Sequence, residues 1–204
     1  MTGTGTVRLT LLAPAAGVEL RAAAFGADGP LDEAGRRALA GVRAPAARRA
    51  LTGPSPRCRE TAAGLGLAAA ADDRLADWDM GRWRGRTLDE VSAAEPEAVT
   101  AWLADPDAAP HGGESLHALL TRVGGWLDGA DGRPDGTDGA HGAGAEGGRT
   151  IAVAEVAVIR AALVHALQLP PEVFWRLDVP PLTATELSGR AGRWNLRCGR
   201  PLTA

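Results

Sequence analysis

Residues 149–169 read RTIAVAEVAVIRAALVHALQL, and this stretch couples a buried strand to a helix. The run TIAVAE is almost wholly apolar, as expected of a strand that is covered on both faces of its sheet. A buried strand that leads directly into a helix is the repeating unit of an α/β fold.

The same alternation recurs along the chain. Strands are predicted at 6–12 and 49–55, helices at 30–42, 56–67 and 112–130, a broken helix at 87–105, and a closing hairpin at 182–188 and 193–198. We therefore predict one domain over residues 1–204, an α/β three-layer sandwich with a mostly parallel central sheet.

One segment interrupts the alternation. Residues 129–148 are mostly glycine, aspartate and alanine, which bury too little apolar surface to repay the cost of ordering. We predict a flexible surface loop there. Its aspartates suggest a calcium loop, but the required glutamate spacing is missing.

Composition excludes several function classes. The chain has 204 residues, a net charge of −3 and no lysine, so it lacks the basic surface typical of proteins that bind nucleic acid or anionic membranes. Two cysteines are too few for a disulfide framework. No signal peptide or membrane-length apolar run is recognised, so we expect a soluble, cytoplasmic protein.

Ligands of open α/β sheets bind at the carboxyl ends of the strands. Five motifs fall where such a crevice would form: DGPLDEAG (28–35), PSPRCRETA (54–62), LADWDMGRWRG (75–85), GGES (112–115) and VAEVAVIRAAL (153–163). Their order and content resemble the histidine phosphatase superfamily, with its phosphoglycerate mutase-like fold. The pattern is most similar to the α-ribazole phosphatase and small mutase branch.

The resemblance assigns roles to particular residues. Arg57 matches the second phosphate-clamping arginine of the family, and Asp77 matches the acidic proton donor of many members. Glu114 belongs to the matching GGES motif, so the resemblance places it among the ligand-binding residues together with Arg57 and Asp77.

The departures from the family fall on the chemistry. The family carries Arg-His-Gly after its first strand, whereas this chain has Ala13, Pro14 and Ala15. The second family histidine corresponds to Glu155. Proline has no heteroatom in its side chain with which to form a covalent intermediate, so the resemblance implies a degenerate member without either catalytic histidine.

Alternatives remain open for the charged residues. Glu155 either forms an ion pair with Arg57 or serves as a catalytic or ligand-binding carboxylate, and Asp77 either caps a solvated loop or faces the pocket. His111 together with Asp77 and Glu155 is a weak candidate for a metal site. Cys58 is expected to pack inward, and no cofactor is predicted.

These observations support functions of different classes. The first is a binding or regulatory protein that has lost phosphatase and mutase activity, with a cationic or neutral small molecule or a protein in the former phosphate pocket. The resemblance to degenerate members points weakly to a cobalt or cobalamin context. The second is an enzyme that uses Asp77 and Glu155 as an acid–base pair, and the third is a residual phosphatase. A homodimer is left open.

Overall fold

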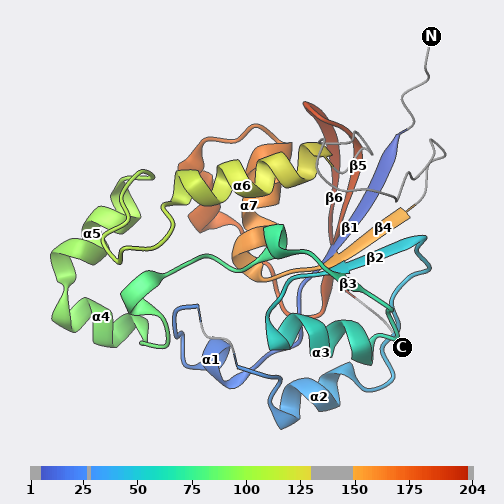
Figure 1. Cartoon of the computed structure of the whole chain (residues 1–204), viewed down its shortest axis with the longest axis horizontal. Helices are drawn as coiled ribbons and strands as arrows, with labels where there is room; N and C mark the ends of the chain where they lie inside the picture. Colours follow the sequence, from blue (N-terminus) through green and yellow to red (C-terminus); the bar gives the residue numbers. More distant parts are fainter. Residues whose placement is uncertain (1–5, 27–28, 130–148, 202–204) are drawn as a thin grey trace.

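The computed structural model describes residues 6–26, 29–129 and 149–201, and its centre is a single six-stranded sheet (Figure 1). The strand order is β3-β2-β4-β1-β5-β6. The strands are β1 (Val7–Leu12), β2 (Arg49–Thr52), β3 (Ala70–Ala71), β4 (Arg149–Val153), β5 (Thr183–Arg190) and β6 (Arg193–Pro201). The first four strands in this order run parallel to one another, and β5 and β6 form an antiparallel hairpin beside β1.

Helices cover both faces of the sheet, which confirms the predicted α/β class. They are α1 (Val18–Arg21), α2 (Glu33–Leu39), α3 (Pro56–Gly64), α4 (Leu88–Ala94), α5 (Pro96–Ala104), α6 (Leu116–Gly129) and α7 (Val156–Ala166). In Figure 1, α2 and α3 lie on one side of the sheet, α6 and α7 lie on the other, and α4 and α5 extend to the side.

The central strands β1 and β4 are largely apolar because most of their residues are buried on both faces of the sheet. In β4, Ile151 and Val153 join the cluster that packs against α2 and α3, whereas Ala152 belongs to the cluster on the α6–α7 side. Successive side chains of a strand point to opposite faces, so an uninterrupted apolar run is the pattern that a central strand requires.

Local signals place the helix ends. Ser55 caps α3 by accepting a hydrogen bond from the Cys58 N–H at 3.1 Å, and Pro56 occupies the first turn, where its missing N–H costs little. A capping box of Thr87 and Glu90 begins α4. Pro96 divides the segment 87–105 into α4 and α5, as the sequence predicts.

The predicted loop at 129–148 lies outside the described residues, apart from Gly129 at the end of α6. Among the residues that are described, no helix has the length and apolar character needed to cross a bilayer.

The parallel strands bring three loops to one edge of the sheet. The Ala154 N–H donates to the carbonyl oxygen of Leu12 at 3.1 Å, and the Gly53 N–H donates to that of Val153 at 2.8 Å. The chain segments that follow β1, β2 and β4 therefore lie side by side, as expected for the carboxyl ends of parallel strands.

Candidate functional site

Two helices begin next to each other at this edge, and their cap residues are in contact. Ser55 precedes α3 and Glu155 precedes α7. The Glu155 side chain makes no capping bond to its own helix. Its Oε1 instead accepts a hydrogen bond from Ser55 Oγ at 2.8 Å.

Arg57 and Glu155 form a buried ion pair. The guanidinium makes two hydrogen bonds to the carboxylate, one from Nη2 to Oε2 and one from Nε to Oε1. Only 12% of the Arg57 side chain and 3% of the Glu155 side chain are exposed. Burial alone would lower the pKa of Arg57, but the hydrogen bonds and charge of Glu155 outweigh it and raise that pKa.

A cavity of about 290 Å³ opens beside this pair. Arg57, Asp77, Glu155 and Arg160 are its charged lining residues. The sequence has six tryptophans, two phenylalanines and no tyrosine, and three of the tryptophans and both phenylalanines also line it. These aromatic residues are Phe25, Trp78, Trp102, Phe174 and Trp175. We call this space the aromatic cavity.

Asp77 reaches the same cavity from the irregular segment between the two short 3-10 helices at Asp73–Leu75 and Gly81–Trp83. Its Oδ1 accepts a hydrogen bond from the Trp78 N–H at 2.8 Å. The negative charge of Asp77 also helps to raise the pKa of Arg57, so the two side chains attract each other. The structure thus brings together Arg57, Asp77 and Glu155.

The loop after β1 offers backbone contacts and no reactive side chain. Ala13, Pro14 and Ala15 are buried and are not among the residues that line the aromatic cavity. The Ala15 N–H donates to Thr61 Oγ1 at 3.1 Å, which ties this loop to α3. The Ala13 N–H donates to the carbonyl oxygen of Thr183 at 3.0 Å.

The model of the histidine phosphatase superfamily (branch 1) matches residues 19–199. The chain belongs to this superfamily. The match begins after the Ala13–Ala15 loop.

Sequence relatives match parts of the chain. It is 34% identical to the bifunctional protein Rv2228c of Mycobacterium tuberculosis over 102 residues, which cover 46% of this chain and 28% of that protein. It is 37% identical to a glucosyl-3-phosphoglycerate phosphatase of Mycolicibacterium vanbaalenii over 93 residues, which cover 38% of this chain and 41% of the relative. The matched region therefore spans less than half the length of these relatives.

Solved structures match almost the whole chain. The mycobacterial glucosyl-3-phosphoglycerate phosphatase Rv2419c with inorganic phosphate is 28% identical, with a TM-score of 0.70 over 94% of this chain and 96% of its own. A putative α-ribazole-5′-phosphate phosphatase of Escherichia coli has a TM-score of 0.78 at 17% identity, over 97% of this chain and 98% of its own. The latter likeness concerns the fold alone.

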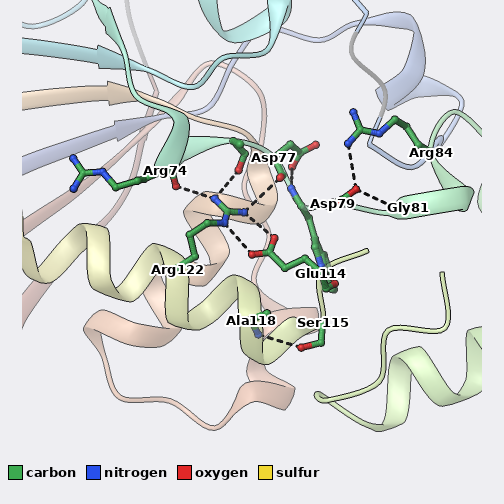
Figure 2. Close-up of polar contacts among 11 residues, drawn as sticks. Arg74, Asp77, Asp79, Gly81, Arg84, Glu114, Ser115, Ala118 and Arg122 are labelled. Carbon is green, nitrogen blue, oxygen red and sulfur yellow. Dashed lines mark hydrogen bonds and ion pairs between the residues drawn. The ribbon is translucent and has the colours of Figure 1, made fainter. Parts of the chain in front are cut away.

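Glu114, unlike Arg57, lies outside the aromatic cavity. It is not among the residues that line the cavity, and its carboxylate receives two hydrogen bonds from Arg122, at 2.9 and 2.8 Å. Figure 2 shows the same guanidinium bound to backbone carbonyls of the segment that carries Asp77, including those of Arg74 at 2.8 Å and Ala76 at 3.0 Å. Glu114 and Arg122 thus hold the Asp77 segment in place.

Close packing requires a glycine at position 113 of the GGES motif. A Cβ added to Gly113 would lie 2.1 Å from the carbonyl oxygen of Asp79, so only glycine allows the two loops to approach. The Glu114 carbonyl oxygen accepts a hydrogen bond from Trp78 Nε1 at 2.6 Å. The motif therefore supports one wall of the cavity.

The three weak candidates for a metal site are not grouped in the structure. His111 is buried, its Nδ1 accepts from the Gly113 N–H at 3.0 Å, and its ring packs on Trp83 at 5.1 Å. Burial lowers its pKa. It does not line the cavity with Asp77 and Glu155, and in the described part of the chain no three His, Cys, Asp or Glu residues are grouped to hold a metal ion.

Arg160 is a cavity residue that the sequence analysis missed. It lies on α7 one turn after Val156, which also lines the cavity, and its guanidinium carbon lies 5.8 Å from the centre of the Phe174 ring. Its Nε is buried without a hydrogen-bond partner, and burial lowers its pKa. The spacing of four from Val156 was the available signal, because residues four apart share a helix face.

Proposed function

We propose that this member of the histidine phosphatase superfamily binds a small ligand in the aromatic cavity and does not transfer phosphoryl groups. The observation that carries the proposal is the ion pair between Arg57 and Glu155, since it neutralises the arginine that the family resemblance assigns to phosphate. The absence of a nucleophilic side chain in the segment Ala13, Pro14 and Ala15 adds to it.

The electrostatics disfavour a phosphate at this position. A phosphate oxygen 4–5 Å from the Glu155 carboxylate would be repelled by about 3–4 kcal/mol per pair of charges at an effective dielectric near 20. Arg57 has to leave its carboxylate partner before it can bind another anion. We infer that inorganic phosphate and phosphomonoesters bind weakly, in contrast to the relative whose structure contains inorganic phosphate.

Phosphatase assays test the loss of activity. We expect turnover of p-nitrophenyl phosphate by the purified protein to equal that of a blank without protein. Turnover that is sensitive to vanadate and is abolished by Arg57→Ala would overturn the proposal, because it would place phosphoryl chemistry in this crevice.

A charge substitution tests the physical reason. In Glu155→Gln the amide still accepts from Ser55, but the negative charge that holds Arg57 is removed, so we expect inorganic phosphate to bind at least roughly tenfold more tightly by calorimetry. The control is Glu60→Gln, which removes the same charge from an exposed ion pair of α3 with Arg36. Equal phosphate affinity in all three proteins would contradict the electrostatic argument.

A second function has one observation in its favour. Asp77 and Glu155 line the same cavity, as an acid–base pair would have to. Glu155 already accepts hydrogen bonds from Ser55 and Arg57, which leaves it poorly suited to exchange a proton with substrate. Recovery of bound ligand chemically unchanged after incubation distinguishes the binding protein from such an enzyme.

The volume of the cavity bears on the cobalt and cobalamin context. A cavity of about 290 Å³ lies at the small end of ligand sites and favours a ligand far smaller than a corrinoid. Calorimetric titration with divalent cobalt and with cobinamide tests both, and heats equal to those of buffer dilution would remove this context.

A further inference from the structure

The aromatic side chains of the cavity pack against one another and form an aromatic wall. The rings of Trp102 and Trp175 meet edge to face at 4.6 Å, and those of Trp78 and Trp175 lie at 5.8 Å with a tilt of 38°. Trp78 and Trp102 are buried, whereas Trp175 and Phe25 are only partly covered. A planar molecule in the cavity that lies against this wall gains edge-to-face or offset-stacked contacts as well as apolar burial.

The unpartnered polar atoms of the lining are hydrogen-bond donors. Arg160 Nε and Trp102 Nε1 are both buried without a partner. The carboxylates of Asp77 and Glu155, by contrast, already accept hydrogen bonds from the protein. A complementary ligand therefore has to bring an acceptor, because an unpaired buried donor is costly.

Of the two arginines and two carboxylates in the lining, Arg160 is the cation that an anionic ligand can pair with. Glu155 matches Arg57, whereas Arg160 takes part in none of the ion pairs found among the described residues. The surface carboxylate of Asp178 favours its charge only at longer range. The cavity also includes Val156 and Ala157 in the first turn of α7, whose N-terminus favours an anion.

On these grounds we propose that the aromatic cavity binds a one- or two-ring aromatic molecule that carries a single carboxylate, with its ring among the tryptophans and its carboxylate on Arg160. This inference rests on the proposed binding function and names the ligand class for it. Arginine is the side chain best suited to a planar carboxylate, which it can bind through two parallel hydrogen bonds. A dianionic phosphate is disfavoured, because its second charge adds to the repulsion from the two carboxylates of the lining.

Three probes with the same ring system test the proposal: 2-naphthoate, the uncharged 2-naphthamide and 2-naphthyl phosphate. Each is titrated into the wild-type protein by calorimetry and by quenching of tryptophan fluorescence. We expect 2-naphthoate to bind most tightly of the three. Equal affinity for the carboxylate and the amide, or tightest binding of the phosphate, would overturn the assignment without any variant.

The variant Arg160→Met keeps an unbranched apolar side chain and removes the guanidinium with its charge. We expect it to weaken 2-naphthoate roughly tenfold to a hundredfold, in line with the loss of a charge-assisted hydrogen bond, and to change 2-naphthamide less than about threefold. The control is Arg176→Met, which removes a charge from an exposed side chain at the end of the neighbouring 3-10 helix Pro171–Arg176. An unchanged affinity for 2-naphthoate in a folded Arg160→Met protein would overturn the role of Arg160.

The same samples separate this inference from the proposed function. Release of fluorescent 2-naphthol from 2-naphthyl phosphate would refute the loss of phosphatase activity, while the comparison of naphthoate with naphthamide still decides the ligand class. Absence of both hydrolysis and naphthoate binding would overturn the ligand class alone. Circular dichroism and the thermal midpoint establish that each variant is folded.

Discussion

Cys58 is a potentially reactive residue at the edge of the site. Its thiol is buried, with Sγ 3.5 Å from Glu155 Oε1. Burial, and then the charge of Glu155, raise the pKa of the Cys58 thiol well above its ordinary value. The protonated thiol therefore contributes stability below the unfolded-state pKa, and this contribution is lost as the pH rises toward the folded-state pKa.

We expect the folded protein to protect Cys58 from iodoacetamide at pH 8. Each unit of raised pKa lowers the thiolate fraction about tenfold, so alkylation should be at least roughly tenfold slower than in urea-unfolded protein. Mass spectrometry of the peptide that contains Cys58 measures both rates. Similar rates in the folded and unfolded protein would show that this thiol is neither buried nor held protonated.

Single residues differ in how far the sequence predicts them. The pairing of Arg57 with Glu155 could be weighed in advance, because opposite charges follow neighbouring parallel strands. The spacing of Arg160 from Val156 indicates only a shared helix face. An arginine on a helix is usually solvated, and the packed structure shows that its Nε is buried. Trp102 and Trp175 come together from distant parts of the chain, and no local pattern encodes that contact.

At the scale of elements, the contact between α6 and α7 depends on one of two adjacent glycines. A Cβ added to Gly124 would lie 2.4 Å from His165 Nδ1, whereas a Cβ on Gly125 would meet nothing within 4 Å. His165 Nε2 is also within 3.0 Å of Asp128 Oδ2, so its ring is held between the two helices.

The two glycines form a matched pair of substitutions. We expect Gly125→Ala to raise the free energy of unfolding by about 0.5–1 kcal/mol, the usual helix gain over glycine. Gly124→Ala should instead lower it by about 1–2 kcal/mol, because overpacking displaces the His165 ring. Urea denaturation of both variants measures the difference, and equal effects would contradict the close packing of α6 on α7.

Several helices could be predicted from the sequence because residues that cap helices precede them. Asp32, Ser55 and Thr87 cap the helices that follow them, as their residue types indicate. The helix predicted at 112–130 begins only at Leu116, since Gly112 adopts a φ of +78° in the preceding turn. The role of Glu114 was missed because its partner Arg122 looks like an ordinary surface residue of α6.

At the scale of the whole molecule, the strand–helix alternation predicts the class, and the family resemblance supplies the topology. Periodicity alone does not say on which edge the β5–β6 hairpin adds, because that depends on contacts with β1 distant in sequence. The two-residue strand β3 is too short for any periodic signal. The aromatic cavity arises at this scale, because its lining comes from six separate segments of the chain.

Several carboxylates accept hydrogen bonds that lower their pKa values. Glu95 at the start of α5 accepts hydrogen bonds from Arg82, Trp83 and Arg86, and these bonds, that of Arg82 foremost, lower its pKa. The pKa of Asp79 is lowered mainly by the Gly81 N–H. Burial opposes the shift at Asp72, but hydrogen bonds from Arg74 prevail, so its pKa is lowered as well.

A lowered pKa in the folded state fixes the direction of the pH dependence. Each of these carboxylates contributes stability above its unfolded-state pKa, near 4, and loses it as the pH falls through the folded-state value. We expect the urea midpoint to be level between about pH 7 and pH 5 and to fall steeply below about pH 4. Glu95→Gln should lower the midpoint at pH 7 and flatten that fall, whereas Glu97→Gln, at an exposed carboxylate in the first turn of α5, should follow the wild type. A midpoint that stays constant down to pH 3.5, or an equal acid dependence of wild type and Glu95→Gln, would show that these carboxylates do not stabilise the folded protein.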